Sequence, residues 1–444
     1  MIRFIRSLYL NQRLFFVLGG CISLFVFAFS FPFLISIAQL VLLGTLGLLI
    51  VDILVLYRVR DGMEGTRQMA EKLSNGDENQ VVLHIKSLYS FKTHLKVIDE
   101  LPEQLQMRHL QLGGVWLPSE TKSLTYQVRP VRRGQYQFGV LNLFVSGNIG
   151  LVARRYQLPL AKTVPVYPSY IQLRKYELYA ISDRLVELGV KRIRKIGQNM
   201  EFDQIRNYVP GDDYRSVNWK ATARKSQLMV NQFRDERSQQ VFSVIDKGRM
   251  MKMPFNGLTL LDYAINAALV ISNIAIKKSD KAGLVTFGRN VGTMLAASNR
   301  SGQMALIMEA LYNQKTGFKE PDFEALAMQL KIKITQRSLI LLYTNFETLS
   351  SMERQMRYLR LIAKQHLLVV VLFQNTELRS LLQFKPQGTE EIYLKTIAEK
   401  FVHEKRQIVK ELNRHGIHTI LTAPENLTVN TINKYLELKA RNLI

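Results

Sequence analysis

The chain has 444 residues, of which 47% are hydrophobic and 22% are charged, so we expect most of it to fold into two or three domains. Its formal net charge of +24 favours a negatively charged partner: nucleic acid, an anionic membrane surface or an acidic protein. The single cysteine, Cys21, excludes a disulfide framework or a cysteine-based metal site within one chain.

Two apolar runs near the N-terminus predict a membrane anchor. Leu14–Phe31 and Phe33–Tyr57 are almost continuously apolar, and each is long enough to cross a hydrocarbon core of about 30 Å as a helix. The second run follows at once and no convincing cleavage site precedes it, which argues against a removed signal peptide. Residues 14–57 are therefore predicted to form two transmembrane helices; two buried core helices are the alternative.

Charge on either side of these runs predicts their orientation. The turn between them is uncharged, whereas both outer flanks carry arginines: Arg3, Arg6, Arg13, Arg58 and Arg60. Positively charged flanks stay in the cytoplasm, so residues 1–13 and everything after residue 58 are expected there. Asp52 lies near the cytoplasmic end of the second run and can reach the interface, so we expect no special role for it.

A β-domain is predicted after a short linker. Residues 58–76 are polar and glycine-containing, and we interpret them as a juxtamembrane helix and linker. Short strand-like runs such as VVLHI, LTYQVRPV and YQFGVLNLFV follow, separated by Pro, Gly and Ser. This spacing is typical of an antiparallel β-sandwich, which we place at residues 77–170.

Strands and helices alternate in the C-terminal part, residues 237–444. Alternation of apolar strands with helices predicts a doubly wound, Rossmann-type α/β sheet. The expected strands are Val241–Asp246, Gly283–Phe287, Ser338–Thr344, Leu367–Phe373 and Thr419–Thr422. The expected helices are Leu258–Lys278, Gly302–Tyr312, Ser351–Lys364, Thr389–His415 and Val429–Arg441.

The first strand of this sheet ends in a candidate metal ligand. Ligands bind beyond the carboxyl ends of parallel strands, and Asp246 stands there, with Thr316 and Asp322 on a later loop. Carboxylate and hydroxyl oxygens suit Mg²⁺. However, Gly248 and Met250 occupy the places where further oxygens are wanted. The alternative role for Asp246 is to cap the following turn.

Catalytic motifs are absent from the sequence. There is no phosphate-binding P-loop, no nucleophile elbow and no zinc-protease motif, and no nucleophile stands with a base. A basic run, Lys191–Lys195, lies in a predicted helix over Gln172–Gln198. It lacks the aromatic positions of nucleic-acid modules, so we interpret it as a solvated face or a lipid headgroup contact.

The connecting segment, residues 171–236, contains the densest stretch of the chain, Arg206–Glu236. It combines a Pro-Gly turn, paired aspartates, several arginines and a large apolar side chain, Trp219. Arginine–carboxylate pairs would stiffen a joint between two domains, with Trp219 as a packed anchor. Arg and Trp also favour protein interfaces, so docking is a possible second use of the same surface.

This stretch resembles the signature of a bacterial family, domain-of-unknown-function family 58. The matching text is Glu201-Phe202, Ile205 to Arg215 and Asn218 to Arg224, with Arg133 to Gly139 upstream resembling the end of that family's β-domain. The signature residues that we single out are Glu201, Arg206, Tyr208, Pro210, Gly211, Asp212, Asp213, Arg215, Trp219, Thr222 and Arg224.

The resemblance implies a protein of the bacterial inner membrane with a β-sandwich and a von Willebrand factor A-like domain, both facing the cytoplasm. It also implies a MoxR-type AAA+ ATPase as partner. Family members with an intact adhesion-type metal site have Asp-x-Ser-x-Ser after the first strand. This chain matches only Asp246 and has Asn345 where a later carboxylate is expected, so no bound cofactor is expected.

The sequence thus favours a non-enzymatic, membrane-tethered scaffold or adaptor that binds a cytoplasmic protein through its A-like domain. No nucleic acid and no small-molecule substrate is expected. The alternative is a Mg²⁺-dependent ligand-binding protein or enzyme centred on Asp246.

Overall fold

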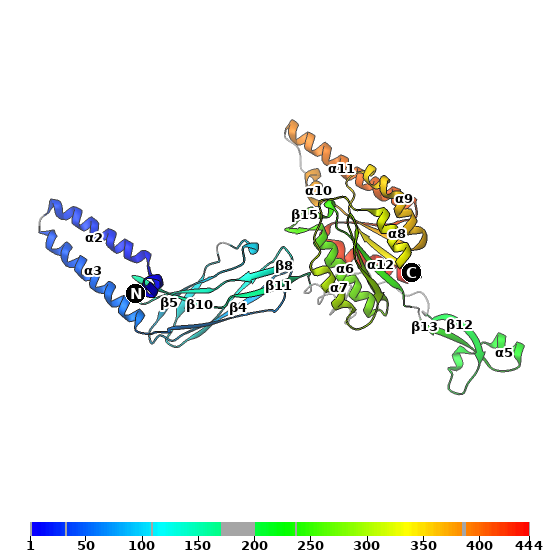
Figure 1. Cartoon of the computed structure of the whole chain (residues 1–444), viewed down its shortest axis with the longest axis horizontal. Helices are drawn as coiled ribbons and strands as arrows, with labels where there is room; N and C mark the ends of the chain where they lie inside the picture. Colours follow the sequence, from blue (N-terminus) through cyan, green and yellow to red (C-terminus); the bar gives the residue numbers. More distant parts are fainter. Residues whose placement is uncertain are drawn as a thin grey trace. The chain divides into compact units, whose positions relative to one another are not determined.

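A computed structural model describes residues 2–31, 33–107, 110–169, 200–235, 238–383 and 388–443. The chain divides into two compact units, Met1–Tyr167 and Pro168–Ile444 (Figure 1). The predicted basic helix over residues 172–198, including Lys191–Lys195, lies outside the described residues.

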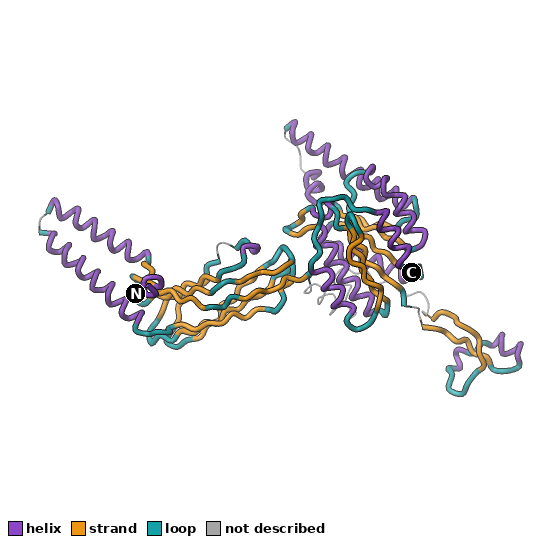
Figure 2. The backbone as a smooth tube through the Cα atoms, viewed as in Figure 1, coloured by secondary structure: helices purple, strands orange, loops and turns teal. Residues whose placement is uncertain are grey.

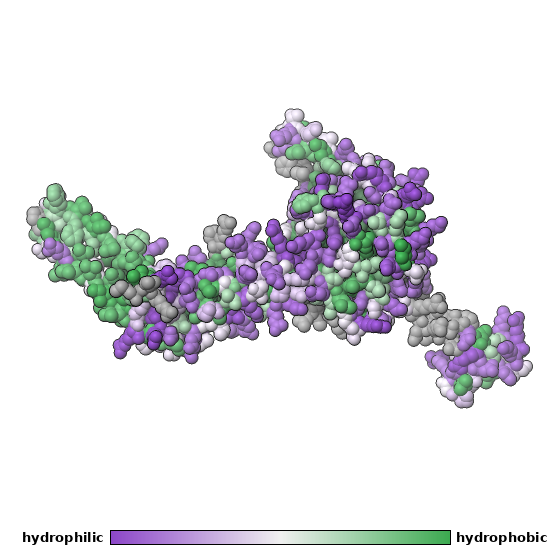
Figure 3. Space-filling model, viewed as in Figure 1, coloured by the Kyte–Doolittle hydropathy of each residue, from purple (hydrophilic) through white to green (hydrophobic). Residues whose placement is uncertain are grey.

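Two long apolar helices follow a short N-terminal helix, α1 (Ile2–Ser7), in the first unit. Helix α2 spans Gln12–Ser30 and helix α3 spans Leu34–Tyr57, with mean hydropathies of 2.0 and 2.5. Only 17% of each apolar window is buried, and Figure 3 shows the apolar surface that results. A third apolar helix, α6 (Leu260–Lys277), is 78% buried and belongs to a protein core. Helices α2 and α3 therefore have the length and exposed apolar surface of a membrane anchor, as predicted.

The rest of the first unit is rich in β-strands. A five-stranded sheet has the order β1-β10-β9-β5-β6, and two three-stranded sheets have the orders β2-β4-β7 and β3-β11-β8. The strands are β1 (Leu8–Leu10), β2 (Met63–Met69), β3 (Leu73–Ser74), β4 (Asn79–Ser87), β5 (Thr93–Asp99), β6 (Leu112–Trp116), β7 (Thr121–Val128), β8 (Gly134–Phe138), β9 (Leu141–Ser146), β10 (Val152–Leu158) and β11 (Lys162–Tyr167). All three sheets contribute to one hydrophobic core, which includes the fully buried Trp116.

Two segments differ from the sequence-based expectation. Residues 63–69, assigned to a helical linker, form strand β2 and pair antiparallel with β4. Burial alternates along β2, with Glu64, Thr66 and Gln68 facing outward. The inner face also contains a polar residue, Arg67, which pairs with the buried Asp99, so the sequence shows no alternation of apolar and polar residues. Residues 8–10, assigned to an N-terminal tail, form β1 and pair with β10. The N-terminus and the β-rich domain therefore lie on the same side of the helical hairpin.

The C-terminal end of α3 is built into the β-rich domain. The Asp52 carboxylate accepts the backbone N–H groups of Leu151 and Val152, at 2.8 and 3.0 Å. Tyr89 donates its hydroxyl to the Leu56 carbonyl, and Arg154 donates to the same carbonyl, each at 3.0 Å. The expectation that Asp52 has no special role is wrong, because its buried carboxylate accepts the backbone N–H groups of Leu151 and Val152.

The second unit contains a three-layer α/β domain (Figure 2). Its sheet has the order β18-β17-β14-β19-β20-β21, and every neighbouring pair is parallel except β17 with β18. The strands are β14 (Gln240–Asp246), β17 (Lys281–Phe287), β18 (Val291–Ser298), β19 (Leu339–Tyr343), β20 (Leu367–Phe373) and β21 (His418–Thr422). The further helices are α7 (Gln303–Tyr312), α8 (Phe323–Lys333), α9 (Leu349–Gln365), α10 (Thr376–Gln383), α11 (Thr389–Arg414) and α12 (Leu427–Ala440).

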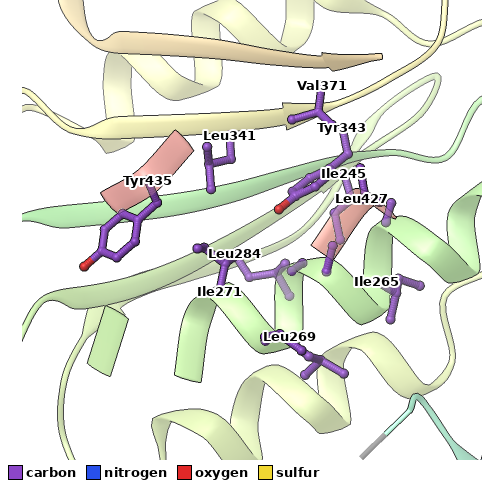
Figure 4. Close-up of a cluster of buried hydrophobic side chains, with 14 of the residues drawn as sticks. Ile245, Ile265, Leu269, Ile271, Leu284, Leu341, Tyr343, Val371, Leu427 and Tyr435 are labelled. Atoms are coloured by element: carbon purple, nitrogen blue, oxygen red, sulfur yellow. The ribbon is translucent and has the colours of Figure 1, made fainter. Parts of the chain in front are cut away.

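Successive strand residues supply the two hydrophobic cores on opposite faces of the sheet. One core joins the sheet to α6, α7 and α12; in Figure 4, Ile245 and Tyr343 of the sheet lie beside Ile265 of α6 and Leu427 of α12. The other core joins the sheet to α8, α9 and α11. The expected strand–helix alternation is present, and the sequence reading omitted β18, α8 and α10. Because helices cover both faces of the sheet, a ligand site is expected among the loops at the carboxyl ends of the strands.

Candidate functional site

The signature stretch folds as a β-hairpin that carries a structured loop. Strand β12 (Met200–Asn207) pairs antiparallel with β13 (Met229–Asp235), with a register irregularity between Phe202 and Gln204. The loop between them contains a short 3₁₀ helix, Tyr214–Ser216, and helix α5, Trp219–Lys225. The sequence analysis singled out this stretch but did not predict its hairpin form.

An arginine–aspartate pair closes the first part of the loop. The Arg206 guanidinium donates to both carboxylate oxygens of Asp212, at 2.8 and 2.7 Å, and Asp212 also accepts the Val209 N–H at 2.9 Å. Hydrogen bonds from Arg206 hold the pKa of Asp212 below its usual value. Gly211 has a φ of +111°, in the left-handed region that glycine adopts without strain. The Pro-Gly turn is thus fixed by side chains on both its sides.

Local caps hold the second part of the loop. Asp213 accepts the Arg215 N–H at 3.0 Å, and Asn218 accepts the Ala221 N–H at 3.0 Å as the N-cap of α5. The Thr222 hydroxyl accepts the Met229 N–H at 3.0 Å and so attaches α5 to the start of β13. Such caps each contribute about 1 kcal/mol, so the loop has a defined conformation without a large core.

The loop presents large apolar side chains to solvent. Trp219 is 70% exposed and Tyr214 is 73% exposed, and Val209 and Leu228 are also exposed. The expectation that Trp219 is a packed anchor is wrong, because α5 has only seven residues and places the indole on its outer side. Exposed basic side chains accompany the aromatic ones: Arg215, Lys220, Arg224 and Lys225.

The role as a joint stays a prediction, because residues 170–199 and 236–237, which flank the hairpin, lie outside the described residues. Of the other signature residues, Glu201 pairs with Arg234 through the backbone, and Pro210 is exposed on the turn. Tyr208 is half-buried, and its N–H donates to the Leu228 carbonyl at 2.8 Å, continuing the hairpin beyond β12.

Asp246 lies at the carboxyl end of β14, but its oxygens have protein donors. One oxygen accepts the Gly248 N–H at 2.6 Å, and the other accepts the Thr344 hydroxyl at 2.7 Å. The side chain is buried, and burial raises the pKa of Asp246 to about 6 although both hydrogen bonds oppose the rise. Asp246 therefore ties the first turn after β14 to the end of β19, the turn-capping role that was the alternative.

The residues proposed to complete a metal site do not line the cavity beside Asp246. A cavity of about 220 Å³ beside Asp246 has Glu320 and Pro321 among its lining residues, but neither Thr316 nor Asp322. The Asp322 carboxylate caps α8 by accepting the Ala325 N–H at 2.9 Å. Among the described residues, no group of three or more His, Cys, Asp or Glu side chains is placed to hold a metal ion. Thr316 and Asp322 therefore do not complete a site with Asp246 as expected, and metal binding at Asp246 stays an untested alternative.

A second cavity, of about 270 Å³, shares Asn345 and Glu347 with the first and is lined by Lys405 of α11. Lys405 was not singled out from the sequence. A signal was present, since α11 buries residues at a spacing of three and four, and Lys405 occupies one place in that stripe: Ala398, Lys405, Ile408, Leu412. A charged residue in an apolar stripe marks a special environment.

Comparison with known proteins gives a family match for part of the chain but no activity. Residues 204–394 match the model of "Protein of unknown function DUF58". A curated relative, the uncharacterized protein YeaD of Bacillus subtilis (strain 168), is 26% identical over 281 residues, which is 61% of this chain and 64% of the relative. This chain thus covers less than two thirds of that relative's length.

Two of the similar solved structures are distant likenesses. The conserved hypothetical protein BatB from Bacteroides thetaiotaomicron is 12% identical, with a TM-score of 0.30, over 46% of this chain and all of that chain. The CARDB domain of the PF1109 protein from Pyrococcus furiosus, in complex with di-metal ions, is 16% identical, with a TM-score of 0.17, over 23% of this chain and 86% of that chain. At these TM-scores neither likeness defines the fold of this chain.

Proposed function

We propose that this chain, a DUF58 protein over residues 204–394, is a membrane-anchored scaffold or adaptor that binds a cytoplasmic protein through its C-terminal unit. Its role is non-enzymatic in this proposal. The single observation that carries it is the signature hairpin, whose capped loop holds Trp219 and Tyr214 in exposed positions. Exposing two large aromatic rings on an ordered loop is unfavourable in water unless a partner covers them.

The positive charge of the hairpin loop indicates what kind of protein surface it would bind. Basic side chains surround the two rings, and the whole chain carries a formal net charge of +24, so the partner surface is proposed to be acidic with an apolar centre. A MoxR-type AAA+ ATPase is the partner class implied by the family resemblance, and we propose it here on that basis. The hairpin supports a protein partner, and the resemblance alone supports an ATPase.

The finer fold and the location are parts of the same proposal. We propose that the α/β domain is von Willebrand factor A-like; its antiparallel edge strand β18 and the position of Asp246 after the first central strand support this. The anchor is proposed to lie in the inner membrane, with both units in the cytoplasm. Support comes from the basic flanks and from the pairing of β1 with β10, which keeps the N-terminus beside the β-rich domain.

Co-purification from native membranes tests the proposal. The full-length chain, Trp219→Ala and Tyr214→Ala are each recovered in mild detergent, and the accompanying proteins are identified by mass spectrometry. The matched control is Tyr393→Ala, which removes an equally exposed ring, 68% accessible, from α11. A protein that accompanies the unmodified chain and Tyr393→Ala but is lost from both hairpin variants supports the proposal. Equal recovery with all four chains removes the hairpin as the docking element, and an ATPase absent from every sample removes the partner class.

A further inference from the structure

The cavity of about 270 Å³ lies at the carboxyl ends of β19, β20 and β21. Helix α11 and the short hairpin of β15 (Pro254–Phe255) and β16 (Leu258–Thr259) contribute to its walls. Its lining is mostly apolar, with three aromatic rings: Phe255, Phe373 and Phe401. Its volume is close to the lower end of the range for small-molecule sites, about 300–1,000 Å³. Space, position and lining are thus those of a site for a compact apolar molecule.

Lys405 is one of the polar residues in this lining, together with Asn345, Glu347, Gln374, Asn375 and Arg406. The Nζ of Lys405 donates to the Asn345 side-chain oxygen at 2.5 Å and to the Phe346 carbonyl. Burial lowers the pKa of Lys405 to about 8, so the group is still mainly protonated at neutral pH. An ammonium has three N–H donors, and the Asn345 oxygen and the Phe346 carbonyl accept two of them. One donor is left for the cavity that Lys405 lines.

A lysine at this position is costly for packing alone. Its neighbours in the α11 stripe, Ala398, Ile408 and Leu412, are almost completely buried. Leu or Met would continue the stripe without desolvating a charge, whereas a buried cation is stabilised only by good acceptors. Two neutral acceptors and the nearby carboxylate of Glu347 compensate Lys405 in part. An anion in the cavity would complete that compensation.

The charges around the cavity select the anion. Glu347 and Arg406 also line it, and with Lys405 they give a net charge of one positive unit. A single remaining N–H suits a carboxylate better than a phosphate, which presents more acceptor oxygens and more charge. Apolar walls suit an aromatic or short aliphatic body attached to that carboxylate.

We propose that this cavity binds a small apolar monocarboxylate, with its carboxylate on the Lys405 ammonium and its body among Phe255, Phe373 and Phe401. The inference concerns a site separate from the exposed hairpin loop and does not depend on the proposed adaptor role. The α/β domain would then bind a small-molecule ligand in addition to any protein partner.

Fluorine NMR with two matched probes tests the inference. The full-length chain in lipid nanodiscs is titrated with 4-(trifluoromethyl)benzoate and, separately, with 4-(trifluoromethyl)benzamide, which has the same shape and no charge. The main variant is Lys405→Met, which keeps a long unbranched side chain and removes the ammonium group. The control is Lys400→Met, which removes an exposed positive charge from the same helix. Leu378→Trp, a substitution in the cavity wall, is the second variant.

The expected result is that Lys405→Met weakens benzoate binding by about tenfold or more and leaves benzamide binding unchanged. Lys400→Met is expected to bind both probes as the unmodified chain does, and Leu378→Trp to lose both. If Lys405→Met is misfolded, two other results support the site. A folded Leu378→Trp variant binds neither probe, and the unmodified chain binds benzoate more tightly than benzamide. Equal benzoate affinity in Lys405→Met and the unmodified chain overturns the inference, as does undetectable benzoate binding to the unmodified chain.

Discussion

The carboxylate of Asp52 accepts the backbone N–H of Leu151 at 2.8 Å and so joins the second apolar helix to a residue 99 positions later in the chain. The same oxygen accepts the N–H of Val152, at the start of β10. The part of α3 before Asp52, residues 34–51, is about 27 Å long at 1.5 Å per residue, close to the hydrocarbon thickness. In the proposed membrane-anchored chain, Asp52 would therefore mark the place where α3 passes from lipid contact to protein contact.

Asp52→Leu is predicted to lower the free energy of unfolding of the β-rich domain by about 2–4 kcal/mol, because two buried N–H groups lose their acceptor. Asp52→Asn keeps one oxygen acceptor and is predicted to cost less. The measurement is denaturant unfolding in detergent micelles, followed by fluorescence of the fully buried Trp116 in a Trp219→Phe background. Identical unfolding of the Leu variant and the unmodified chain would show that these hydrogen bonds do not stabilise the domain.

Trp219→Ala is predicted to change stability by about 0.5 kcal/mol or less, since its ring is 70% exposed. Trp116→Ala, in the β-rich core, is the contrast and is predicted to cost about 3–5 kcal/mol. Thermal unfolding of both variants measures the difference. A large loss of stability in Trp219→Ala would mean that the ring packs against another part of the chain, which would support the predicted role of the hairpin as a joint.

Arg206→Lys is predicted to loosen the loop between β12 and α5, although it conserves charge. Lysine cannot reproduce the two-point hydrogen bonding of the guanidinium to Asp212. We expect faster amide hydrogen exchange in residues 207–213 and unchanged exchange in β14. Arg215→Lys is the control, because Arg215 uses its backbone N–H rather than its side chain in the contact with Asp213. Unchanged exchange in Arg206→Lys would contradict a bracing role for the pair.

Asp246 is predicted to make the α/β domain less stable as pH rises from about 4 to 6. Its pKa is raised from 3.8 to about 6 by burial, so the native state binds more protons than the unfolded state in that interval. The stabilising effect of protonation is complete below pH 3.8 and is lost as pH passes 6, a change of about 3 kcal/mol.

Asp246→Asn removes that dependence, because its amide oxygen can accept the Gly248 N–H and its amide N–H can donate to Thr344. The melting temperature of the Asn variant, relative to the unmodified chain at the same pH, is predicted to rise by about 6–12 °C between pH 4 and 6.5. A difference that stays constant with pH would show that Asp246 is charged in the native state throughout.

Mg²⁺ is predicted to leave the melting temperature of the chain unchanged, since Thr316 and Asp322 do not line the cavity of Asp246. The titration compares Mg²⁺ and Mn²⁺ with a chelator, on both the unmodified chain and Asp246→Asn. Stabilisation by either ion that disappears in Asp246→Asn would support the metal-dependent alternative.

Local sequence patterns were sufficient for the large elements and insufficient for the contacts between them. Apolar runs of strand length located β14, β19 and β20 because both faces of those strands are buried. Strand β2 was missed because its outward side chains are polar and its partner β4 determines its pairing. Nothing near Asp52 in the sequence indicates donors at residues 151 and 152. The Lys405 cavity was predictable in part, from one lysine in the apolar stripe of α11.

The tie between Asp52 and β10 has a consequence for how the protein is made. At about 5–20 residues per second, a ribosome needs about 5–20 s to travel from Asp52 to Leu151. A membrane-anchored chain thus inserts α2 and α3 while the donors for Asp52 do not yet exist, so the carboxylate stays at the lipid–water boundary, where its charge resists deeper entry. Biosynthesis sets the depth of α3 first, and folding of the β-rich domain then locks it.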